Sequence, residues 1–271
     1  MTTVAQALAL AASMGVARLD AQLLVARRLG VERPWLIAHP EAELDDRHTA
    51  ACRADFERRA DGVPLSYLTG EREFHSLRLV VTADVLDPRP DTETLVDWAL
   101  EHVGDTTCDV ADLGTGSGAI ALAIKQARPH ARVRATDRSP QALALARQNA
   151  RHLGLDIEWS EGDWWQALPG MRFDLVVSNP PYVAADDPHL LALRHEPMHA
   201  LTPGPRGLEA IERIVAGAGP HLRCGAWLLL EHGYDQAPAV RSCLLRHGFA
   251  GVTTRSDLSG AVRCTGGRRV A

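Results

Sequence analysis

The residues best suited to chemistry form a short turn, Asn179-Pro180-Pro181-Tyr182, directly after an apolar run at 173–178. Two consecutive prolines stiffen the backbone, because each ring fixes its φ angle. The Asn179 side-chain oxygen and the carbonyl oxygens of Asn179 and Pro180 can then be aimed at one point, where two acceptors match the two coplanar donors of an –NH2 group. Tyr182 adds a ring that can pack on a flat group. The turn predicts catalytic roles for Asn179, Pro180 and Tyr182, with Pro181 as a further substrate contact.

Such a turn favours methyl transfer to an amide or exocyclic amine nitrogen. An amide nitrogen is a poor nucleophile because its lone pair is delocalised into the carbonyl group. Acceptors that take both N–H groups orient that lone pair, and alignment with an activated methyl group removes much of the entropic barrier. The cofactor carries the hard part of such a reaction, so no strong general base is required before the transfer.

A glycine-rich segment upstream predicts where that cofactor binds. Residues 110–118 read as a strand that runs into a tight turn, and a helix follows at once. Glycines let the backbone approach a ligand closely, and a helix N-terminus offers free N–H groups. The G-x-G-x-G spacing favours S-adenosylmethionine over a dinucleotide. The predicted cofactor contacts in this turn are Gly114, Thr115, Gly116, Ser117 and Gly118.

Acidic and aromatic residues at the ends of the next two strands extend the predicted cofactor site. Asp137 ends the second strand, where a carboxylate can accept hydrogen bonds from both ribose hydroxyls. Asp163 and Trp164 follow the third strand and can bracket an adenine ring.

The elements that must position these residues alternate along the chain. Strands are expected at 109–113, 132–136, 157–160, 173–178 and 226–231, with two more between 251 and 270. Helices are expected at 119–127, 140–153 and 207–217, and another follows a cap at Asp91 or Thr92. This alternation predicts an α/β fold with a mostly parallel sheet covered by helices on both faces. Residues 1–69 read as a small helical bundle, 70–88 as a linker with a β-hairpin, and 89–271 as the catalytic domain.

Composition limits the possible partners. The formal net charge of −5 argues against a protein that coats nucleic acid, because phosphate neutralisation needs clustered basic residues. The five cysteines show no C-x-x-C spacing, and an odd number of scattered cysteines suits a reducing cytoplasm. His195 and His199 match H-E-x-x-H, but Pro197 between them disfavours the helical turn that this zinc motif needs, so no metal is expected. No apolar run is long enough to predict a membrane span.

Further motifs give the chain a resemblance to a known family. Residues 67–74 read Tyr-Leu-Thr-Gly-Glu-Arg-Glu-Phe, and residues 88–93 read Pro-Arg-Pro-Asp-Thr-Glu. The stretches at 112–118, 194–197 and 230–233 agree as well. With the NPPY turn, these motifs resemble the bacterial HemK/PrmC family, whose members methylate a glutamine of class 1 peptide chain release factors. The match spans nearly the whole chain.

The resemblance implies a Rossmann-like, seven-stranded class I methyltransferase sheet, joined by a hairpin to an N-terminal helical domain that recognises the partner. It implies S-adenosyl-L-methionine as cofactor, with Asn179 among the residues that contact it, and S-adenosyl-L-homocysteine as product. It also implies a target glutamine in a Gly-Gly-Gln loop that enters at 179–182. Gly204-Pro205-Arg206-Gly207-Leu208 departs from the family pattern, and so do Gly266 and Gly267 near the C-terminus.

Two alternatives remain open at the level of sequence. The NPPY turn is shared with enzymes that methylate adenine N6 or guanine N2, which must flip the base out of its stack. A basic groove would be expected for such a substrate, and the net charge disfavours it. The second alternative is an adaptor that keeps the fold without catalysis, and binding of S-adenosylmethionine would separate it from the enzymes.

Overall fold

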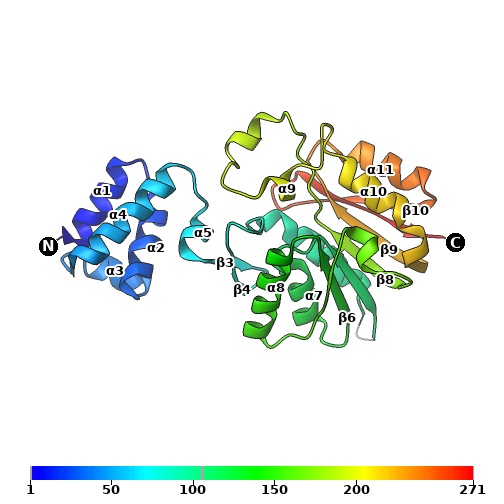
Figure 1. Ribbon diagram of the computed structural model, residues 1–271, viewed down its shortest axis with the longest axis horizontal. Coiled ribbons are helices and arrows are strands. Elements are labelled where there is room, and N and C mark those ends of the chain that lie inside the picture. Colours follow the sequence, from blue (N-terminus) through cyan, green and yellow to red (C-terminus); the bar gives the residue numbers. More distant parts are fainter. Residues whose placement is uncertain (1, 105–106, 271) are drawn as a thin grey trace. The chain divides into compact units, whose positions relative to one another are not determined.

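The computed structural model describes residues 2–104 and 107–270, which divide into two compact units, Met1–Glu71 and Arg72–Ala271. Figure 1 shows helices throughout the first unit and a sheet flanked by helices in the second. Each unit has its own buried hydrophobic cluster, and the residues that could do chemistry belong to the second.

The first unit is the small helical bundle that the sequence predicts. Its elements are β1 (Thr2–Thr3), α1 (Val4–Ser13), α2 (Arg18–Leu29), α3 (Arg33–Ala38), β2 (Glu43–Leu44), α4 (Asp46–Ala60) and α5 (Leu65–Thr69). A capping box starts α1, because the Thr3 and Gln6 side chains each accept a hydrogen bond from the backbone N–H of the other. Leu24, Leu36 and Phe56 are almost fully buried at its centre.

The hairpin expected within the linker at 70–88 is present as β3 (Glu71–Phe74) and β4 (Leu77–Val80), which pair in a two-stranded sheet. The turn between them places His75 and Ser76 at positive φ angles of 46° and 63°. Phe74, Leu77 and Leu79 turn inward and join the main core of the second unit. The alternation of apolar residues in this segment therefore indicates a hairpin with one face buried.

The second unit contains a seven-stranded sheet of order β10-β11-β9-β8-β5-β6-β7. The strands from β9 to β7 are parallel, and β11 runs antiparallel to both β9 and β10. This mixed sheet confirms the expected fold class. The strands are β5 (Asp109–Leu113), β6 (Arg132–Asp137), β7 (Glu158–Glu161), β8 (Phe173–Ser178), β9 (Leu222–Glu231), β10 (Phe249–Ser256) and β11 (Val262–Arg269).

Helices cover both faces of the sheet (Figure 1). The helices of this unit are α6 (Glu93–His102), α7 (Ala119–Ala127), α8 (Pro140–Leu153), α9 (Met198–Leu201), α10 (Glu209–Gly217) and α11 (Ala237–Arg246). Short 3₁₀ turns lie at Pro90–Thr92, Trp164–Ala167, Pro188–Leu191 and Gly219–His221. Successive strand residues point to opposite faces, so Val177 and Leu229 meet α6 and α7 while Val176 and Leu228 meet α10 and α11.

One expected helix cap differs from the structure. Asp91 or Thr92 is expected to cap α6; Thr92 is its N-cap residue, at the end of a 3₁₀ turn, but the Thr92 side chain makes no capping hydrogen bond. The Thr92 hydroxyl instead accepts a hydrogen bond from Asn179 Nδ2 at 3.2 Å. Thr92 therefore occupies the expected N-cap position, but its side chain makes no capping hydrogen bond to the helix and instead bonds a residue distant in sequence.

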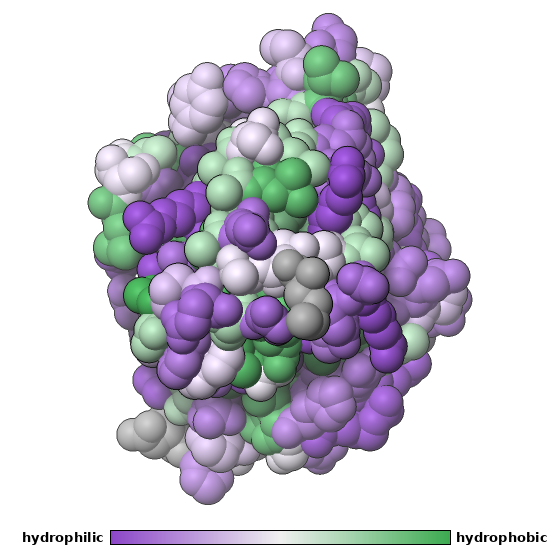
Figure 2. Space-filling view, turned by 90° about the vertical axis from the view of Figure 1, so that its left-hand side faces the viewer, coloured by the Kyte–Doolittle hydropathy of each residue, from purple (hydrophilic) through white to green (hydrophobic). Residues whose placement is uncertain are grey.

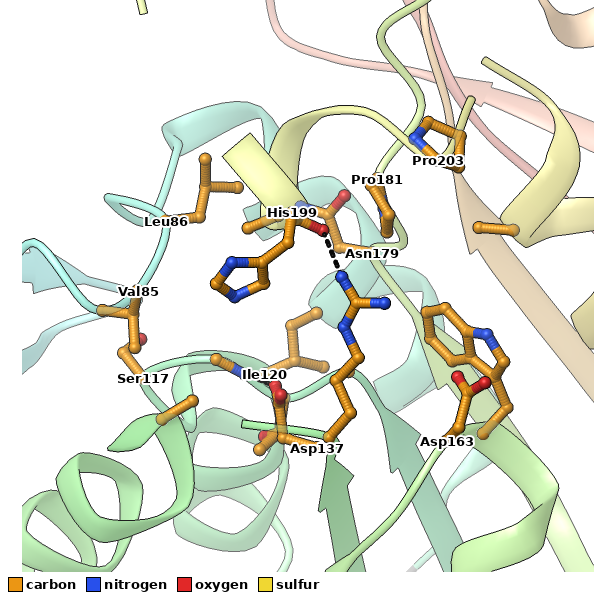
Figure 3. Close-up of a pocket in the computed structure, with 18 of the residues that line it drawn as sticks. Val85, Leu86, Ser117, Ile120, Asp137, Asp163, Asn179, Pro181, His199 and Pro203 are labelled. Atoms are coloured by element: carbon orange, nitrogen blue, oxygen red, sulfur yellow. Dashed lines mark hydrogen bonds between the residues drawn. The ribbon is translucent and has the colours of Figure 1, made fainter. Parts of the chain in front are cut away.

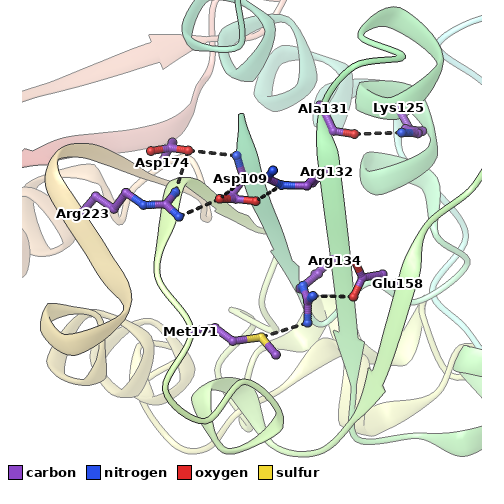
Figure 4. A network of polar contacts seen from close by, with 9 residues as sticks. All are labelled: Asp109, Lys125, Ala131, Arg132, Arg134, Glu158, Met171, Asp174 and Arg223. Atoms are coloured by element: carbon purple, nitrogen blue, oxygen red, sulfur yellow. Dashed lines mark hydrogen bonds and ion pairs between the residues drawn. The ribbon is translucent and has the colours of Figure 1, made fainter. Parts of the chain in front are cut away.

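Ion pairs tie the sheet together at the amino ends of its parallel strands (Figure 4). Asp109 at the start of β5 contacts Arg132 of β6 at 2.5 Å and Arg223 of β9 at 2.6 Å. Arg223 also contacts Asp174 of β8 at 2.7 Å. Hydrogen bonding to Arg132 lowers the pKa of Asp109 to about 2 despite partial burial. Four strands are thereby held in place at the end opposite their carboxyl edge.

The surface carries few large apolar side chains. Leu19, Trp35 and Ile37 are among those exposed on the first unit. On the face shown in Figure 2, hydrophobic residues lie in small areas separated by hydrophilic ones. Within 2–104 and 107–270, no helix is long and apolar enough to cross a membrane.

Candidate active site

A cavity of about 190 Å³ lies at the carboxyl ends of β5, β6 and β8. Parallel sheets bind their ligands at this edge, because the loops that follow the strands converge there. Figure 3 shows Ser117, Asp137, Asp163 and Asn179 around it. Of the residues predicted to form the site, those lining the cavity are Gly114, Thr115, Gly116, Ser117, Asp137, Asp163, Trp164, Asn179 and Pro181.

The glycine turn is pinned to the neighbouring strand by its own backbone. Gly114 N and Thr115 N both donate to the Thr136 carbonyl oxygen, at 2.9 and 2.8 Å. Gly116 has a φ of 56°, which favours glycine, and an added Cβ there would meet nothing within 4 Å. Gly116 is therefore open to the cavity. Gly118 is the residue before α7 and does not line the cavity.

Asp137 ends β6 with its carboxylate held by two backbone donors. Oδ2 accepts from Gly116 N and Oδ1 accepts from Ser139 N, both at 2.9 Å. These bonds fix the carboxylate at the cavity wall and leave lone pairs on both oxygens for ligand hydroxyl groups. Such a geometry fits the ribose of S-adenosylmethionine.

Asp112 lies under the glycine turn and behaves differently. It is fully buried, and burial raises its pKa to about 7, with the nearby Asp137 charge acting in the same direction. The Thr115 hydroxyl donates to Asp112 Oδ2 at 2.6 Å. This bond ties the turn to the strand beneath it, so Asp112 supports the turn from below.

Trp164 and Asp163 form another part of the cavity wall. Trp164 has a positive φ of 51°, and its ring covers Gly114, where an added Cβ would lie 3.1 Å from the ring. This close approach explains why residue 114 lacks a side chain. Asp163 pairs with Arg213 of α10, which also lines the cavity. The Asp163 carboxylate is therefore already neutralised by a protein partner.

The NPPY turn follows β8 and presents Asn179 and Pro181 to the cavity. Ser178 Oγ anchors the end of the strand by donating to the Leu113 carbonyl oxygen at 2.7 Å. Asn179 Nδ2 donates to Thr92, while Asn179 Oδ1 is buried and has no hydrogen-bond partner in the part of the chain that the structure describes. A buried acceptor without a partner is costly, so it indicates a donor supplied by a ligand.

Tyr182 lies behind the cavity wall. Its hydroxyl donates to Glu231 Oε1 at 3.3 Å, and its carbonyl oxygen accepts from Gln236 Nε2 at 2.9 Å. Burial raises the pKa of Tyr182 above its usual range, and the Glu231 charge acts in the same direction. Neither Tyr182 nor Pro180 is among the cavity-lining residues. Their contact with a substrate stays a prediction.

Several residues of the site had no role in the sequence interpretation. Val85 and Leu86 add an apolar wall (Figure 3). Arg138 donates to the His199 carbonyl oxygen at 3.4 Å, and Arg213 pairs with Asp163. Arg138 directly follows Asp137, so its position beside the acidic residue was a usable signal. Val85 and Leu86 lie in a segment without periodicity, and nothing local marks them.

The H-E-x-x-H match is part of a different arrangement. Glu196 is buried and pairs with Arg89, and its Oε2 accepts from Asp87 N at 3.2 Å. His199 lies in the short helix α9 after Pro197. Among the described residues, no group of three His, Cys, Asp or Glu side chains could hold a metal ion.

Comparisons with known proteins agree with this architecture. Residues 3–70 match a family model described as the PrmC N-terminal domain, and residues 71–204 match the methyltransferase small domain. A release factor glutamine methyltransferase of Xylella fastidiosa is 48% identical over 266 residues, covering 97% of each chain. One of Burkholderia pseudomallei is 50% identical over 260 residues, covering 92% of this chain and 91% of that protein.

A solved structure shows the same fold at low identity. The methyltransferase from Pyrococcus furiosus is 17% identical, covers 72% of this chain and 90% of that chain, and superposes with a TM-score of 0.56. Sheet order, glycine turn and domain match together define an S-adenosylmethionine-dependent methyltransferase of the Rossmann-like class.

Within that class, the family is given by relatives that match nearly the whole length of the chain. The chain belongs to the family of release factor glutamine methyltransferases.

Proposed function

We propose that this protein transfers a methyl group from S-adenosyl-L-methionine to the side-chain amide nitrogen of a glutamine. The glutamine lies in the Gly-Gly-Gln loop of class 1 peptide chain release factors, and its methylation modulates translation termination. Release factors act in the cytoplasm, so the protein acts there too. Membership of the family supports this substrate, since its relatives carry the same name over nearly their full length.

The observation that carries the proposal is the unpartnered Asn179 Oδ1 at the cavity wall. A glutamine side chain ends in an –NH2 group with two coplanar donors. One donor pairs with Asn179 Oδ1, and the second pairs with a backbone carbonyl oxygen of the turn. The planar group is then held with its nitrogen facing the cavity that Gly116 and Asp137 line.

The main contribution of the protein to this reaction is to orient the amide nitrogen toward the methyl group. S-Adenosylmethionine supplies a methyl group already activated by its sulfonium charge. Residues of this chain hold the amide nitrogen in line with that methyl group, in the cavity that Pro181 and Trp164 help to line. As the new C–N bond forms, the S–CH3 bond of the sulfonium breaks, S-adenosyl-L-homocysteine leaves as a neutral thioether, and the nitrogen releases one of its two protons to water. The product keeps one N–H, so only one acceptor of the turn still has a donor to bind.

We also propose that the N-terminal unit recognises the release factor. Its exposed apolar side chains include Trp35 and Ile37, which are 39% and 51% exposed. The net charge of −5 favours a protein partner over a nucleic-acid substrate.

The proposal is tested by methyl transfer from labelled S-adenosylmethionine to a purified class 1 release factor. The Gln→Ala variant of its Gly-Gly-Gln loop and a duplex DNA serve as controls. We expect label on the native factor alone, at the loop glutamine. Label on DNA, or equal label on the Gln→Ala factor, would contradict the proposal and favour a base amine or another protein site.

A further inference from the structure

The turn that carries Trp164 is held on both sides by helix α10. Asp163, the residue before Trp164, accepts a hydrogen bond from the Arg213 guanidinium. Trp165, the residue after it, donates its indole N–H to the Ile214 carbonyl oxygen at 2.9 Å. Two successive residues of one helix therefore hold the two chain neighbours of Trp164.

The bond from Trp165 uses an acceptor that the helix leaves free. Helix α10 ends at Gly217, so the Ile214 carbonyl oxygen belongs to its last turn, where carbonyl groups lack partners within the helix. The N–H of Ala218 donates to the Val215 carbonyl oxygen at 3.3 Å instead. The indole N–H supplies a donor in a buried place, and its loss would leave a buried carbonyl group unpaired.

Gly217 provides the space for the Trp165 ring. An added Cβ at residue 217 would lie 2.3 Å from Trp165 Cδ1 and 2.8 Å from its Nε1, which is too close for any side chain. The same ring stacks on His221, with centroids 4.8 Å apart and ring planes 11° from parallel. Trp165 is buried in the hydrophobic cluster that includes Ile214. These contacts allow the indole one position.

Trp164 has a backbone conformation that a bulky residue rarely adopts. Its φ of 51° lies in the left-handed region, which is costly for a large side chain unless the surrounding structure enforces it. In this conformation the ring lines the cavity and lies against Gly114. A return to a negative φ would redirect the ring away from Gly114, so the contacts of its two neighbours keep it in the cavity wall.

We propose that Trp165 and Gly217 are positioning residues for the cofactor, because they hold the Trp164 ring where it packs on the adenine of S-adenosylmethionine. Neither residue is among those that line the cavity, so both act through Trp164. The proposal rests on the proposed function, from which it takes the cofactor. A ring that is fixed before the ligand arrives loses little freedom on binding, which favours affinity.

The effect of these residues is on binding and not on the chemical step. Adenine takes no part in methyl transfer, so a misplaced Trp164 ring raises the Kd for S-adenosylmethionine. The single-turnover rate at saturating cofactor stays within about twofold of wild type, because contacts made equally in ground and transition states do not change it.

The test is calorimetric titration of S-adenosylmethionine into Trp165→Phe, Trp164→Ala and the double variant. Trp165→Phe keeps a ring but removes the N–H, and we expect Kd to rise roughly 3–10-fold. Trp164→Ala removes the stacking ring, and we expect a rise of roughly 5–100-fold. In the Trp164→Ala background, Trp165→Phe changes Kd by less than about twofold, because the ring through which it acts is gone.

Gly217→Ala is a second, independent variant, and we expect it to raise Kd at least as much as Trp165→Phe does, since its methyl group displaces the indole. Gly104→Ala is its control, because an added Cβ there meets nothing within 4 Å. Trp98→Phe is the control for Trp165→Phe, because Trp98 is a buried tryptophan of the other hydrophobic cluster of this unit. Both controls are expected to keep the wild-type Kd.

Wild-type Kd values in Trp165→Phe and Gly217→Ala would overturn the positioning role. An equal rise in Kd from Trp165→Phe with and without Trp164 would overturn it as well, because the effect would then reach the cofactor by another route. The titrations contain no release factor, so a failure to label the glutamine would overturn the proposed function alone.

Discussion

At the scale of single residues, the site separates groups that bind from groups that support them. Asp137 and Asn179 face the cavity, and each is fixed by a hydrogen bond to a neighbouring residue of the cavity wall, Gly116 for Asp137 and Thr92 for Asn179. Asp112 and Glu231 lie one layer deeper, where burial raises the pKa of each to about 7. Preorganised acceptors do not need to reorient when a ligand arrives, which lowers the cost of binding.

The Asp137 carboxylate is expected to determine cofactor affinity. Asp137→Ala removes a charged acceptor and the two bonds that shape the glycine turn, so we expect the Kd for S-adenosylmethionine to rise roughly 10–100-fold. Calorimetric titration measures this change. Asp174→Ala is the control, because it removes a carboxylate at the opposite end of the parallel strands. Wild-type affinity in Asp137→Ala would show that another group holds the ribose.

At the scale of elements, the loop at Gly207 supports the catalytic turn. Gly207 has a φ of 71°, and an added Cβ would lie 2.4 Å from the Tyr182 carbonyl oxygen and 2.9 Å from Gln236 Nε2. Gln236 Nε2 bridges this loop and the catalytic turn, because it donates to the carbonyl oxygens of both Tyr182 and Gly207. Arg206, in the segment that departs from the family pattern, pairs with Glu212 on the first turns of α10.

Gly207→Ala is expected to disturb the NPPY turn through this contact. We expect a loss of about 1–3 kcal/mol in the free energy of unfolding from overpacking, and a slower methyl transfer. Gly154→Ala is the matched control, because Gly154 also has a positive φ, of 66°, but open space around its Cβ position. Urea unfolding and single-turnover rates report the two effects. Equal methyl-transfer rates in Gly207→Ala and Gly154→Ala would show that the loop at Gly207 does not support catalysis.

The sequence predicts most of the elements but few of their long-range contacts. Strands 109–113 and 173–178 and helices 119–127 and 140–153 match the structure, because their apolar runs are bounded by glycine, proline or polar residues. Strand β9 begins at Leu222, four residues earlier than expected, because Arg223, Cys224 and Gly225 interrupt its apolar pattern. Helix α10 begins at Glu209, two residues later than expected.

In the site, too, the positions of residues that follow strands were predictable, whereas contacts between distant residues were not. The glycine turn, Asp137 and Asn179 follow strands directly, so their convergence was predictable from a parallel sheet. Thr92 and Glu231 were not predictable, because Thr92 lies 87 positions from Asn179 and reads locally as a cap. Gly266 was unexplained by sequence, and the structure gives the reason: an added Cβ would lie 2.4 Å from Leu229 Cδ2 and 2.9 Å from the Trp98 ring.

At the scale of the whole molecule, the two ends of the parallel strands have different roles, one in stability and the other in ligand binding. Charged residues tie the amino ends together, and the carboxyl ends carry the cavity (Figures 3 and 4). Asp109 and Asp112 of one strand illustrate this, because arginine partners lower the pKa of Asp109 and burial raises that of Asp112. A rigid sheet between these ends holds the two acceptors of the site, Asp137 and Asn179, at a fixed separation.

The central claim is that Asn179 holds the target amide for methyl transfer. The most direct measurement is the single-turnover rate of Asn179→Ala with a class 1 release factor, alongside its affinity for S-adenosylmethionine. We predict a rate roughly 10²–10³-fold below that of the wild-type protein, with cofactor affinity largely retained. Wild-type turnover, or a loss of cofactor binding that accounts for the whole loss of rate, would contradict this account.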